Sequence, residues 1–333
     1  MSKLKGGKWK RLELTYELES PLHIGFLPSK GSVVSPSRYY VPGKNFWGAV
    51  TKTTTEYLFS YPIGKDYQNI GEEIAKYFRF SYFYILEGNE IYFPCVKGTE
   101  KVYGGKSKLT NCEFESKFIG SRASTAIDFH HGISVYGSLH EIEYIKNKYV
   151  NDGSIETTEL RGVIFFYEDN LISIGEKNQK QAIVRDDGIY IDNFNILRDI
   201  TLGGEQNYGF GRVKLLNIRE ENSYLLDCWD SEEKEIFISV KSGQPVLSHV
   251  KFFDEASLYF QGDIELVSGR EYKKSQGRYQ KPGAHVVKPM YCFSPGTVFY
   301  MDQKSGEQQE SKIIFLLKYD GTMEKVDAIF EDK

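Results

Sequence analysis

The segment of this chain best suited to contact a ligand through its main chain is rich in glycine. It spans residues 202–213 and reads Leu-Gly-Gly-Glu-Gln-Asn-Tyr-Gly-Phe-Gly-Arg-Val. Glycine permits positive φ and a close approach of another chain, and exposed amides in such a loop bind phosphate oxygens. Aromatic rings and a guanidinium beside them offer stacking faces and positive charge. The candidate contact residues are Gly203, Gly204, Tyr208, Gly209, Phe210, Gly211 and Arg212.

This segment has two other interpretations. A glycine-rich stretch can be an irregular hairpin or a β-bulge with no ligand. A dinucleotide-binding loop is disfavoured because that fingerprint follows a strand and opens a helix, whereas here a short predicted helix precedes the glycines and a strand follows them.

A second candidate contact segment covers residues 269–283. It contains five basic residues against one acid, with two tyrosines interleaved. Cations neutralise phosphates and aromatic rings stack on bases, so this composition suits a single nucleic-acid strand. The alternative is a solvated surface loop. The basic residues are Arg270, Lys273, Lys274, Arg278 and Lys281.

A catalytic site is not apparent. Cleavage of RNA without a metal requires a general acid and base, and the adjacent pair His130 and His131 beside Asp128 is the best candidate. Neighbours on a strand point to opposite faces, which argues against a site built from this pair alone. His23 is expected to be a packed, hydrogen-bonded residue. No HExxH, paired DxD or Cys/His cluster suggests a metal, and no cofactor motif is present.

The elements around these segments are predicted from hydrophobic periodicity. Residues 12–18 alternate, which indicates a half-buried first strand, and residues 45–59 carry apolar positions typical of a helix entered through Pro42-Gly43. A short helix over 194–200 and a strand over 212–218 are expected to flank the glycine-rich segment. Further predicted strands of this half are 78–86, 90–96, 139–145 and 160–167. This order is that of a ferredoxin-like unit with insertions.

An acidic run from Arg219 to Glu235 separates this half from a second strand-rich part. We therefore predict two domains, residues 1–222 and residues 223–333, in an α+β fold of tandem ferredoxin-like (RRM-like) domains with insertions and antiparallel sheets. The predicted strands of the second part are 236–240, 248–253, 257–261, 291–293, 298–301 and 312–317.

Bulk composition narrows the class of protein. The 333 residues are 40% hydrophobic and 15% aromatic, which is enough for real cores and excludes a disordered chain. The net charge of -4 gives no global attraction for nucleic acid, so any such site must be a local basic patch. Four cysteines without CxxC spacing and no apolar run of about 20 residues indicate a cytoplasmic chain with no membrane contact.

Three segments in order resemble the RAMP superfamily, the repeat-associated guide-RNA-binding proteins of CRISPR systems. Residues 20–25 (Ser-Pro-Leu-His-Ile-Gly) are similar to its first strand ending, and residues 40–50 resemble its helix entry, with Asn45 and Trp47 where the family usually has Ser and Arg. The third segment is the glycine-rich loop with its GFGRV ending. Residues 121–128 resemble the family's basic, Thr-bearing loop, and residues 288–299 resemble the late "GSVF" strand entry of two-domain subunits that hold the 5′ tag of the guide RNA.

This resemblance implies a non-catalytic guide RNA (crRNA)-binding subunit of a CRISPR type III effector in antiviral defence. Its expected partners are the guide RNA, filament-forming RAMP subunits and the large subunit. Arg38 and Lys44 join the glycine-rich and basic segments as expected RNA contacts. Target-slicing relatives carry an Asp between the first strand and first helix, but residues 26–37 contain no carboxylate. The alternatives are a RAMP-type endoribonuclease that processes precursor guide RNA, with His130 or His131 as base, and a protein scaffold that never touches RNA.

Overall fold

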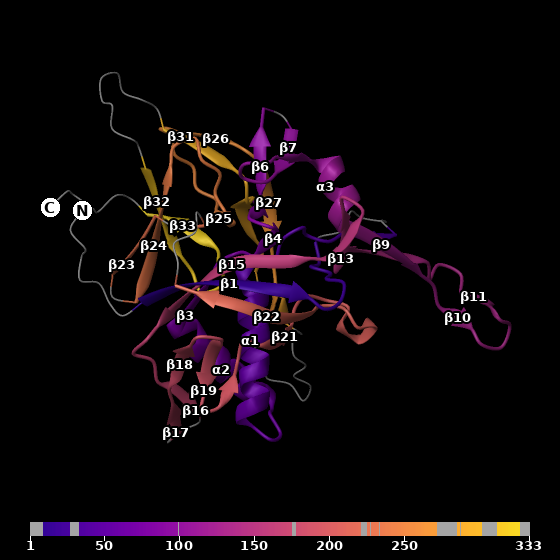
Figure 1. The fold of residues 1–333 in the computed structure, drawn as a ribbon, viewed down its shortest axis with the longest axis horizontal. Coiled ribbons are helices and arrows are strands. Elements are labelled where there is room, and N and C mark those ends of the chain that lie inside the picture. The colour runs from indigo at the N-terminus through magenta and orange to yellow at the C-terminus, as the bar shows by residue number, and fades with distance from the viewer. Residues whose placement is uncertain are drawn as a thin grey trace.

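The computed structural model describes residues 9–26, 33–98, 100–174, 178–220, 225–226, 228–232, 234–271, 285–286, 288–301 and 312–326. Within these residues the chain is α+β and consists mainly of antiparallel strands (Figure 1). The predicted fold class, α+β with antiparallel sheets in ferredoxin-like units that carry insertions, is confirmed.

The first sheet has the ferredoxin-like strand order. Its strands are β1 (Trp9–Leu18), β3 (Phe78–Phe80), β4 (Tyr84–Glu87), β5 (Glu90–Tyr92), β15 (Glu159–Tyr167), β21 (Asp199–Thr201) and β22 (Arg212–Arg219). β22 pairs with β1, β1 pairs with β15, and β15 pairs with β3 and β4, all antiparallel. In ferredoxin-like terms β1 is the first core strand, β3 with β4 the second, β15 the third and β22 the fourth. The order across the sheet is then fourth, first, third, second.

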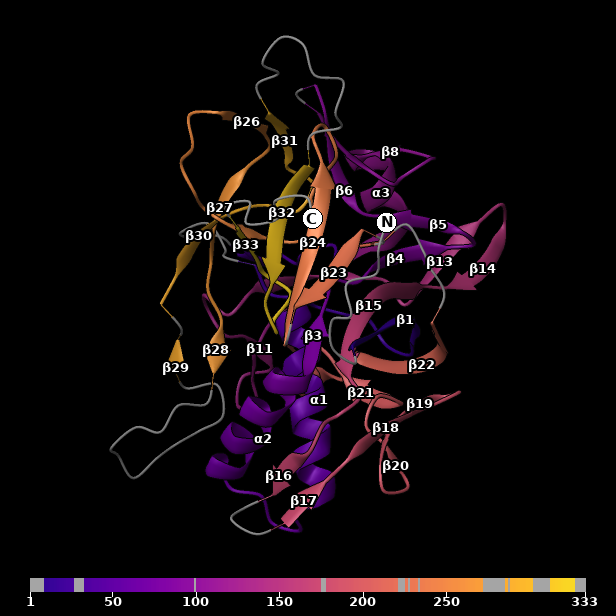
Figure 2. The same cartoon turned by 90° about the vertical axis from the view of Figure 1, so that its left-hand side faces the viewer.

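Two helices cover one face of this sheet (Figure 2). They are α1 (Gly43–Leu58) and α2 (Gly64–Tyr77), so the predicted helix over 45–59 is confirmed to within two residues. Pro42 is the N-cap residue of α1, with φ of -60° and ψ of 147°, and its ring fixes this φ before the helix begins. Phe46 and Val50 face the sheet at helical spacing and are fully buried, and the Phe46 ring lies 5.4 Å from that of Tyr16 on β1.

The first strand is buried on both faces, so the prediction of a half-buried strand is wrong. The alternating Leu12, Leu14, Tyr16 and Leu18 do line the helix-side core. The opposite face of β1 carries Trp9, Arg11 and Glu13, which are also buried because the second part of the chain packs over them. The Nη2 atom of Arg11 donates a hydrogen bond to the carbonyl oxygen of Leu225 at 2.5 Å. Alternation thus located the strand but could not show what covers its polar face.

The predicted helix over 194–200 is also wrong. Residues 194–195 form β20 (Phe194–Asn195), which pairs with β19 (Gly188–Ile191), and the chain then turns into β21. The Asn195 side chain accepts a hydrogen bond from the backbone N–H of Leu197 at 3.0 Å, which stabilises a turn in place of a helix. A short apolar run does not distinguish strand from helix by periodicity, and here hairpin pairing decides.

The second sheet packs against the helix-free face of the first. Its strands are β23 (Trp229–Glu232), β24 (Glu235–Lys241), β25 (Val250–Lys251), β27 (Ile264–Val267), β30 (Met290–Phe293), β32 (Lys312–Leu317) and β33 (Met323–Lys325), in the order β23-β24-β32-β33-β25-β30-β27. Val163 and Phe165 of β15 share one core with Phe293 and Phe315 of the second sheet. The two parts therefore bury a common apolar surface, and their division near residue 222 stays a prediction.

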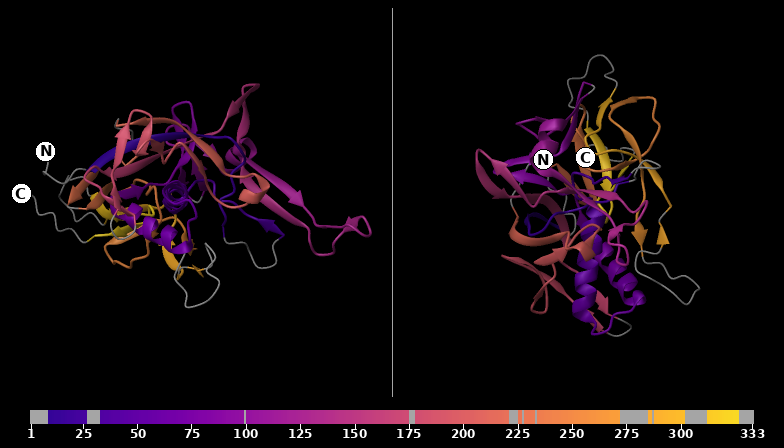
Figure 3. Two further views of the ribbon diagram at one scale, coloured as in Figure 1. Left: turned by 90° about the horizontal axis from the view of Figure 1, so that it is seen from below. Right: turned by 90° about the vertical axis from the view of Figure 1, so that its right-hand side faces the viewer.

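An arm projects from the first sheet (Figures 1 and 3). Its base is formed by β9 (Ile119–Ser124), β12 (His140–Ile145) and β2 (Val34–Ser35), and its tip by β10 (Ile127–Asp128) and β11 (Ile133–Ser134). The arm is continuous with α3 (Asn111–Phe118), whose Thr110 cap accepts from the N–H of Glu113. It is a strand pair that extends beyond the core.

The other described elements are short strands, most of which pair with a neighbour in a hairpin. They are β6 (Pro94–Lys97), β7 (Glu100–Tyr103), β8 (Leu109–Thr110), β13 (Lys148–Asn151), β14 (Ser154–Thr157), β16 (Ile172–Ile174), β17 (Asn178–Lys180), β18 (Ala182–Arg185), β26 (Leu258–Gln261), β28 (Arg270–Glu271), β29 (His285–Val286) and β31 (Val298–Met301), with a 3-10 turn η1 (Gln206–Tyr208). Across the part of the chain described here, no helix combines the length and apolar character needed to cross a bilayer.

Candidate nucleic-acid interface

The glycine-rich loop lies against the end of the first strand. The backbone N–H of Gly211 donates to the carbonyl of Pro21 at 2.8 Å, and that of Gly204 donates to the carbonyl of His23 at 2.9 Å. Leu202 closes the loop by donating to the carbonyl of Gly211 at 2.8 Å. Two segments nearly two hundred residues apart in sequence therefore form one structural unit.

Two of the loop glycines are required by contacts inside the protein. Gly203 has φ of 72°, and a Cβ there would lie 2.2 Å from the carbonyl oxygen of His23. Gly211 has φ of 86°, and a Cβ there would lie 2.0 Å from the carbonyl oxygen of Leu202. At both positions the close neighbour is the protein's own backbone, so the glycine is needed for packing within the loop. The glycine pattern was predicted to receive RNA, and at these two residues it builds the loop.

The tip of the loop is open to a ligand. Glu205 and Gly209 both adopt positive φ on either side of η1, and no atom lies within 4 Å of a Cβ built on Gly209. Tyr208 is 60% exposed, and Arg212, at the start of β22, is also exposed. Phe210 is buried with its ring 5.5 Å from that of Tyr144. Tyr208, Gly209 and Arg212 are therefore the accessible members of the predicted set, while Phe210 is buried.

Arg38 lies in a buried polar network between the two parts of the chain. Its Nη2 is 2.9 Å from Oε2 of Glu265 on β27, and its Nη1 donates to the Tyr40 hydroxyl at 2.8 Å. The carboxylate of Glu265 also contacts Nε2 of His249, whose Nδ1 lies 2.6 Å from the Tyr82 hydroxyl. If Nε2 carries the proton, His249 donates to Glu265 and accepts from Tyr82. Arg38 thus joins the two parts.

Among the other predicted cations, Lys44 lies close to the segment that follows β27. Lys44 is in the first turn of α1, and its Nζ lies 2.8 Å from the position that a Cβ on Gly269 would occupy. Arg270 belongs to β28, which pairs with β29. Lys273, Lys274, Arg278 and Lys281 lie outside the described residues. Two of the predicted RNA contacts, Arg38 and Lys44, therefore meet the same segment, residues 264–271.

The projecting arm carries aromatic residues that the sequence interpretation missed. Phe129 is 95% exposed and Tyr136 is fully exposed, and Ile127, Ile133 and Leu139 are exposed around them. Five large apolar side chains around one hairpin form a surface of the kind that contacts a partner. The positions of these apolar residues follow neither the strand nor the helix period of a buried face. That irregular spacing was the signal in the sequence that they are exposed.

The candidate histidines occupy different environments. His131 Nδ1 lies 2.7 Å from Oδ2 of Asp128 at the exposed arm tip, and this hydrogen bond lowers the pKa of Asp128. His130 donates its backbone N–H to the same carboxylate. His23 is buried with Nδ1 2.7 Å from the carbonyl of Glu143, as expected for a packed residue. Only the arm tip therefore offers an accessible His–Asp pair among the described residues.

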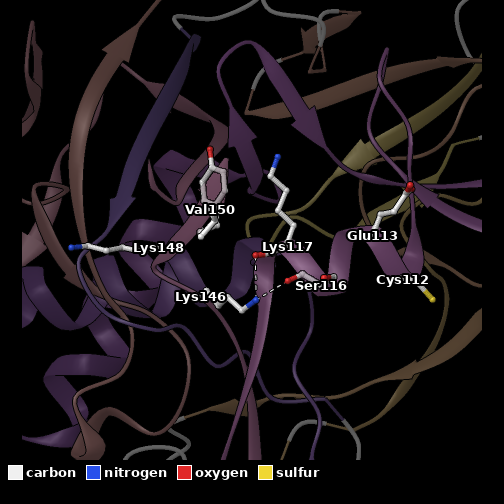
Figure 4. A pocket seen from close by; sticks show the side chains of 8 residues that line it. Cys112, Glu113, Ser116, Lys117, Lys146, Lys148 and Val150 are labelled. Carbon is white, nitrogen blue, oxygen red and sulfur yellow. Dashed lines mark hydrogen bonds between the residues drawn. The ribbon is translucent and has the colours of Figure 1, made fainter. Parts of the chain in front are cut away.

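A cleft of about 620 Å³ lies between α3 and β13 (Figure 4). Lys117, Lys146 and Lys148 line it. Lys117 Nζ is 2.5 Å from Oε1 of Glu87, and Lys146 donates to the carbonyl oxygens of Ser116 and Lys117 at the end of α3. Two of its three ammonium groups are therefore engaged within the protein.

In the described ranges, no group of three or more His, Cys, Asp or Glu side chains is placed to hold an ion. The cysteines are free thiols. Burial raises the pKa of both the Cys95 and Cys292 thiols to about 11, which leaves them protonated at neutral pH.

No protein-family model and no curated protein matches the chain. Among solved structures, it is similar to a chain of the type III-B Cmr-beta complex bound to cognate target RNA, with 14% identity, 87% of this chain and 86% of that chain covered, and a TM-score of 0.46. It is similar to a chain of the Csm3-Csm4 subcomplex of the type III-A CRISPR-Cas interference complex, with 12% identity, coverage of 93% and 99%, and a TM-score of 0.42. It is also similar to a CRISPR protein from Archaeoglobus fulgidus, with 11% identity, coverage of 92% and 94%, and a TM-score of 0.34.

Proposed function

We propose that this chain is a non-catalytic guide RNA (crRNA)-binding subunit of a CRISPR type III ribonucleoprotein effector. In this role it holds the 5′ tag of the guide and contacts neighbouring filament-forming subunits and the large subunit. The observation that carries the proposal is the convergence of three sequence segments that resemble the RAMP superfamily. The glycine-rich loop bonds to Pro21 and His23, and the backbone N–H of Arg38, just before the helix entry, donates to the carbonyl of Ile24 at 2.7 Å.

Exposed groups around this unit suit a single RNA strand. Tyr208 and Arg212 lie on the open side of the glycine-rich loop. Phe129 and Tyr136 stand exposed on the arm, where each ring has faces on which a base can stack. A stacked base contributes about 1 to 3 kcal/mol by alanine substitution, so a few such contacts compensate for a chain whose net charge is -4.

The basic segment of residues 269–283 supplies the test of RNA binding. Replacing Lys273, Lys274 and Arg278 together by Ala is expected to weaken guide RNA binding. The slope of log Kobs against log salt should become shallower by about 2, since each phosphate neutralised on a single strand contributes about 0.7. Filter binding of labelled guide RNA at several salt concentrations, from roughly 50 to roughly 300 mM, measures this slope.

The matched control removes the same charge elsewhere. Lys52, Lys65 and Lys97 are exposed lysines in α1, α2 and β6. Their triple Ala variant should leave the slope unchanged. Equal slopes for the two triple variants and the unaltered protein would exclude the basic segment from the site.

A second candidate function, endoribonuclease processing of precursor guide RNA, rests on the contact between His131 and Asp128. A carboxylate that orients an imidazole is an arrangement used in general base catalysis. The arm tip surrounds this pair with solvent, and the contact that His130 makes with Asp128 is through its backbone N–H. The geometry therefore favours the binding role.

Incubation of the protein with labelled repeat RNA separates these functions. We expect retention of the RNA without cleavage, and no difference between the unaltered protein and the His131→Ala variant. Cleavage that falls by about 100-fold or more in His131→Ala, the size typical of a general base, would establish the nuclease. If the protein neither retains nor cuts the RNA, a protein scaffold is the correct assignment.

A further inference from the structure

The outer strand of the arm has an open edge. β9 is the last strand in the order β2-β12-β9, and it pairs with β12 in unbroken register from Ile119 to Ser124. The arm stands away from the core (Figures 1 and 3). In the part of the chain that the structure describes, no strand pairs with the side of β9 that faces away from β12.

The hydrogen bonds of β12 show which backbone groups of β9 point outward. In an antiparallel pair, two opposite residues exchange both of their backbone hydrogen bonds or neither. Glu141 lies opposite Ala123, but its N–H donates to the carbonyl of Val33 on the other side, at 3.0 Å. Ala123, and Ser121 two residues before it, therefore direct their N–H and C=O groups away from β12.

These four backbone groups are accessible, and among the described residues none of them is bonded. Ser121, Arg122 and Ala123 are exposed. Between residues 120 and 124 only Arg122 has a long side chain, so little covers the main chain. The strand runs for 6 residues in regular register with no proline and no bulge, which is the kind of edge that another strand can extend.

Two other edge strands of this chain are blocked by its own side chains. On β18, the Asn170 side chain pairs with both backbone groups of Ala182: its Nδ2 donates to the carbonyl at 3.0 Å, and its Oδ1 accepts from the N–H at 2.8 Å. On β23, the backbone N–H of Ser231 donates to Oδ1 of Asp230 at 2.7 Å. Proteins commonly block free edges because such edges pair with other chains. β9 lacks a block of this kind among the described residues, as expected of an edge that a partner completes.

The chemistry of this edge fits a polypeptide strand. Its N–H donors and C=O acceptors alternate, and the pattern repeats every second residue, about 7 Å apart. An extended polypeptide offers acceptors and donors with the same repeat, whereas phosphate oxygens only accept and would leave both carbonyls unpaired. Arg122 and the partly exposed Glu141 carry opposite charges, so the edge has little attraction for a phosphate backbone.

We propose that the open edge of β9 binds an extended segment of a neighbouring protein subunit, which adds a strand to the β2-β12-β9 sheet through Ser121 and Ala123. This inference rests on the proposed function, because it states how the chain holds a neighbour in the same assembly. The RNA then contacts other parts of the chain.

The test variant is Ala123→Pro, coexpressed with the filament-forming subunit of its type III complex and with guide RNA. Proline removes the outward N–H and places its ring at the edge, but it leaves the bonds between β9 and β12 intact because Ala123 takes no part in them. Association with the subunit should weaken by about tenfold or more, since one backbone donor is lost and the ring occupies the place of the partner. Guide RNA binding by the chain alone should be unchanged. The matched control, Ala123→Val, keeps the N–H and should associate like the unaltered protein.

Hydrogen exchange provides a second measurement, made on the unaltered protein. The amides of Ser121 and Ala123 should exchange freely in the isolated chain and become protected when the subunit is bound, because a paired strand shields its N–H groups. Guide RNA alone should leave their exchange unchanged.

The outcomes separate this inference from the proposed function. If the subunit binds while both amides still exchange freely, or if Ala123→Pro is folded and associates as well as Ala123→Val, the strand pairing is overturned. Protection by guide RNA alone would place RNA on the edge and overturn it as well. If the unaltered protein binds the subunit but no RNA, the proposed function fails, while protection of the two amides still supports the pairing. If it binds neither, both fail. Thermal denaturation of the two variants establishes that they are folded.

Discussion

Replacing Glu265 by Ala is expected to lower the free energy of unfolding by about 3 to 5 kcal/mol, because removal of one member of a buried ion pair leaves the other charge uncompensated. The Arg38 side chain is 11% exposed and that of Glu265 is 16% exposed, so water cannot replace the lost carboxylate fully. His249, whose side chain is 1% exposed, would lose its acceptor as well. Urea denaturation of the variant and of the unaltered protein measures the difference.

An exposed ion pair provides the control for this prediction. Glu220 contacts Lys10 at 2.9 Å, with side-chain exposures of 60% and 33%. Glu220→Ala should cost no more than about 1 kcal/mol, the usual range for solvent-exposed pairs. A comparable loss in both variants would show that the network around Glu265 contributes no more than a surface contact.

The same network should make the protein sensitive to acid. Burial by itself would raise the pKa of Glu265, but the hydrogen bond from His249 and the ion pair with Arg38 outweigh it and lower the pKa to about 2. Burial lowers the pKa of His249 below its ordinary value. Both groups bind fewer protons in the folded than in the unfolded state, so their stabilising contribution is complete above the ordinary histidine pKa near 6.5 and declines as pH falls. In the Glu265→Gln variant, the part of this decline between about pH 4.5 and about pH 2 should disappear.

Local patterns in the sequence were sufficient to locate elements that have a regular apolar face. The alternation of Leu12 to Leu18 located β1, and the Pro-Gly entry at residues 42–43 located α1. The strand over 212–218 followed from alternation in the same way. In each case the apolar face that the pattern marks is the face that packs in the core.

Contacts between distant residues could not be read from the sequence. Arg38 and Glu265 are 227 residues apart, and nothing in the composition around either indicates the other. For that reason Arg38 was predicted to contact RNA, although its guanidinium is engaged inside the protein. The arm was missed for a different reason: Phe129 and Tyr136 are exposed, so packing against a core imposes no periodicity on their positions.

The glycine-rich loop combines both situations. The sequence identified the loop and its place before β22, but the function of each glycine depends on which atoms lie beside it. Gly211 and Gly209 have nearly the same backbone, with φ of 86° and 83°. A Cβ on Gly211 would lie 2.0 Å from the carbonyl oxygen of Leu202, whereas a Cβ on Gly209 would meet nothing within 4 Å. A substitution at Gly209 therefore tests backbone strain alone, whereas a substitution at Gly211 tests backbone strain together with a steric clash.

Gly209→Ala is expected to cost about 1 to 2 kcal/mol, the strain of a non-glycine residue with positive φ. Gly211→Ala should cost about 1 to 3 kcal/mol more, because the new methyl group forces the main chain at Leu202 to move. That movement would also break the contact of Gly211 with Pro21, so the Gly211 variant should lose more guide RNA affinity than the Gly209 variant. Urea denaturation and RNA binding of the two variants measure these differences. Equal losses of stability would mean that backbone strain alone explains the glycines, and an unchanged RNA affinity in Gly211→Ala would separate the packed loop from the RNA site.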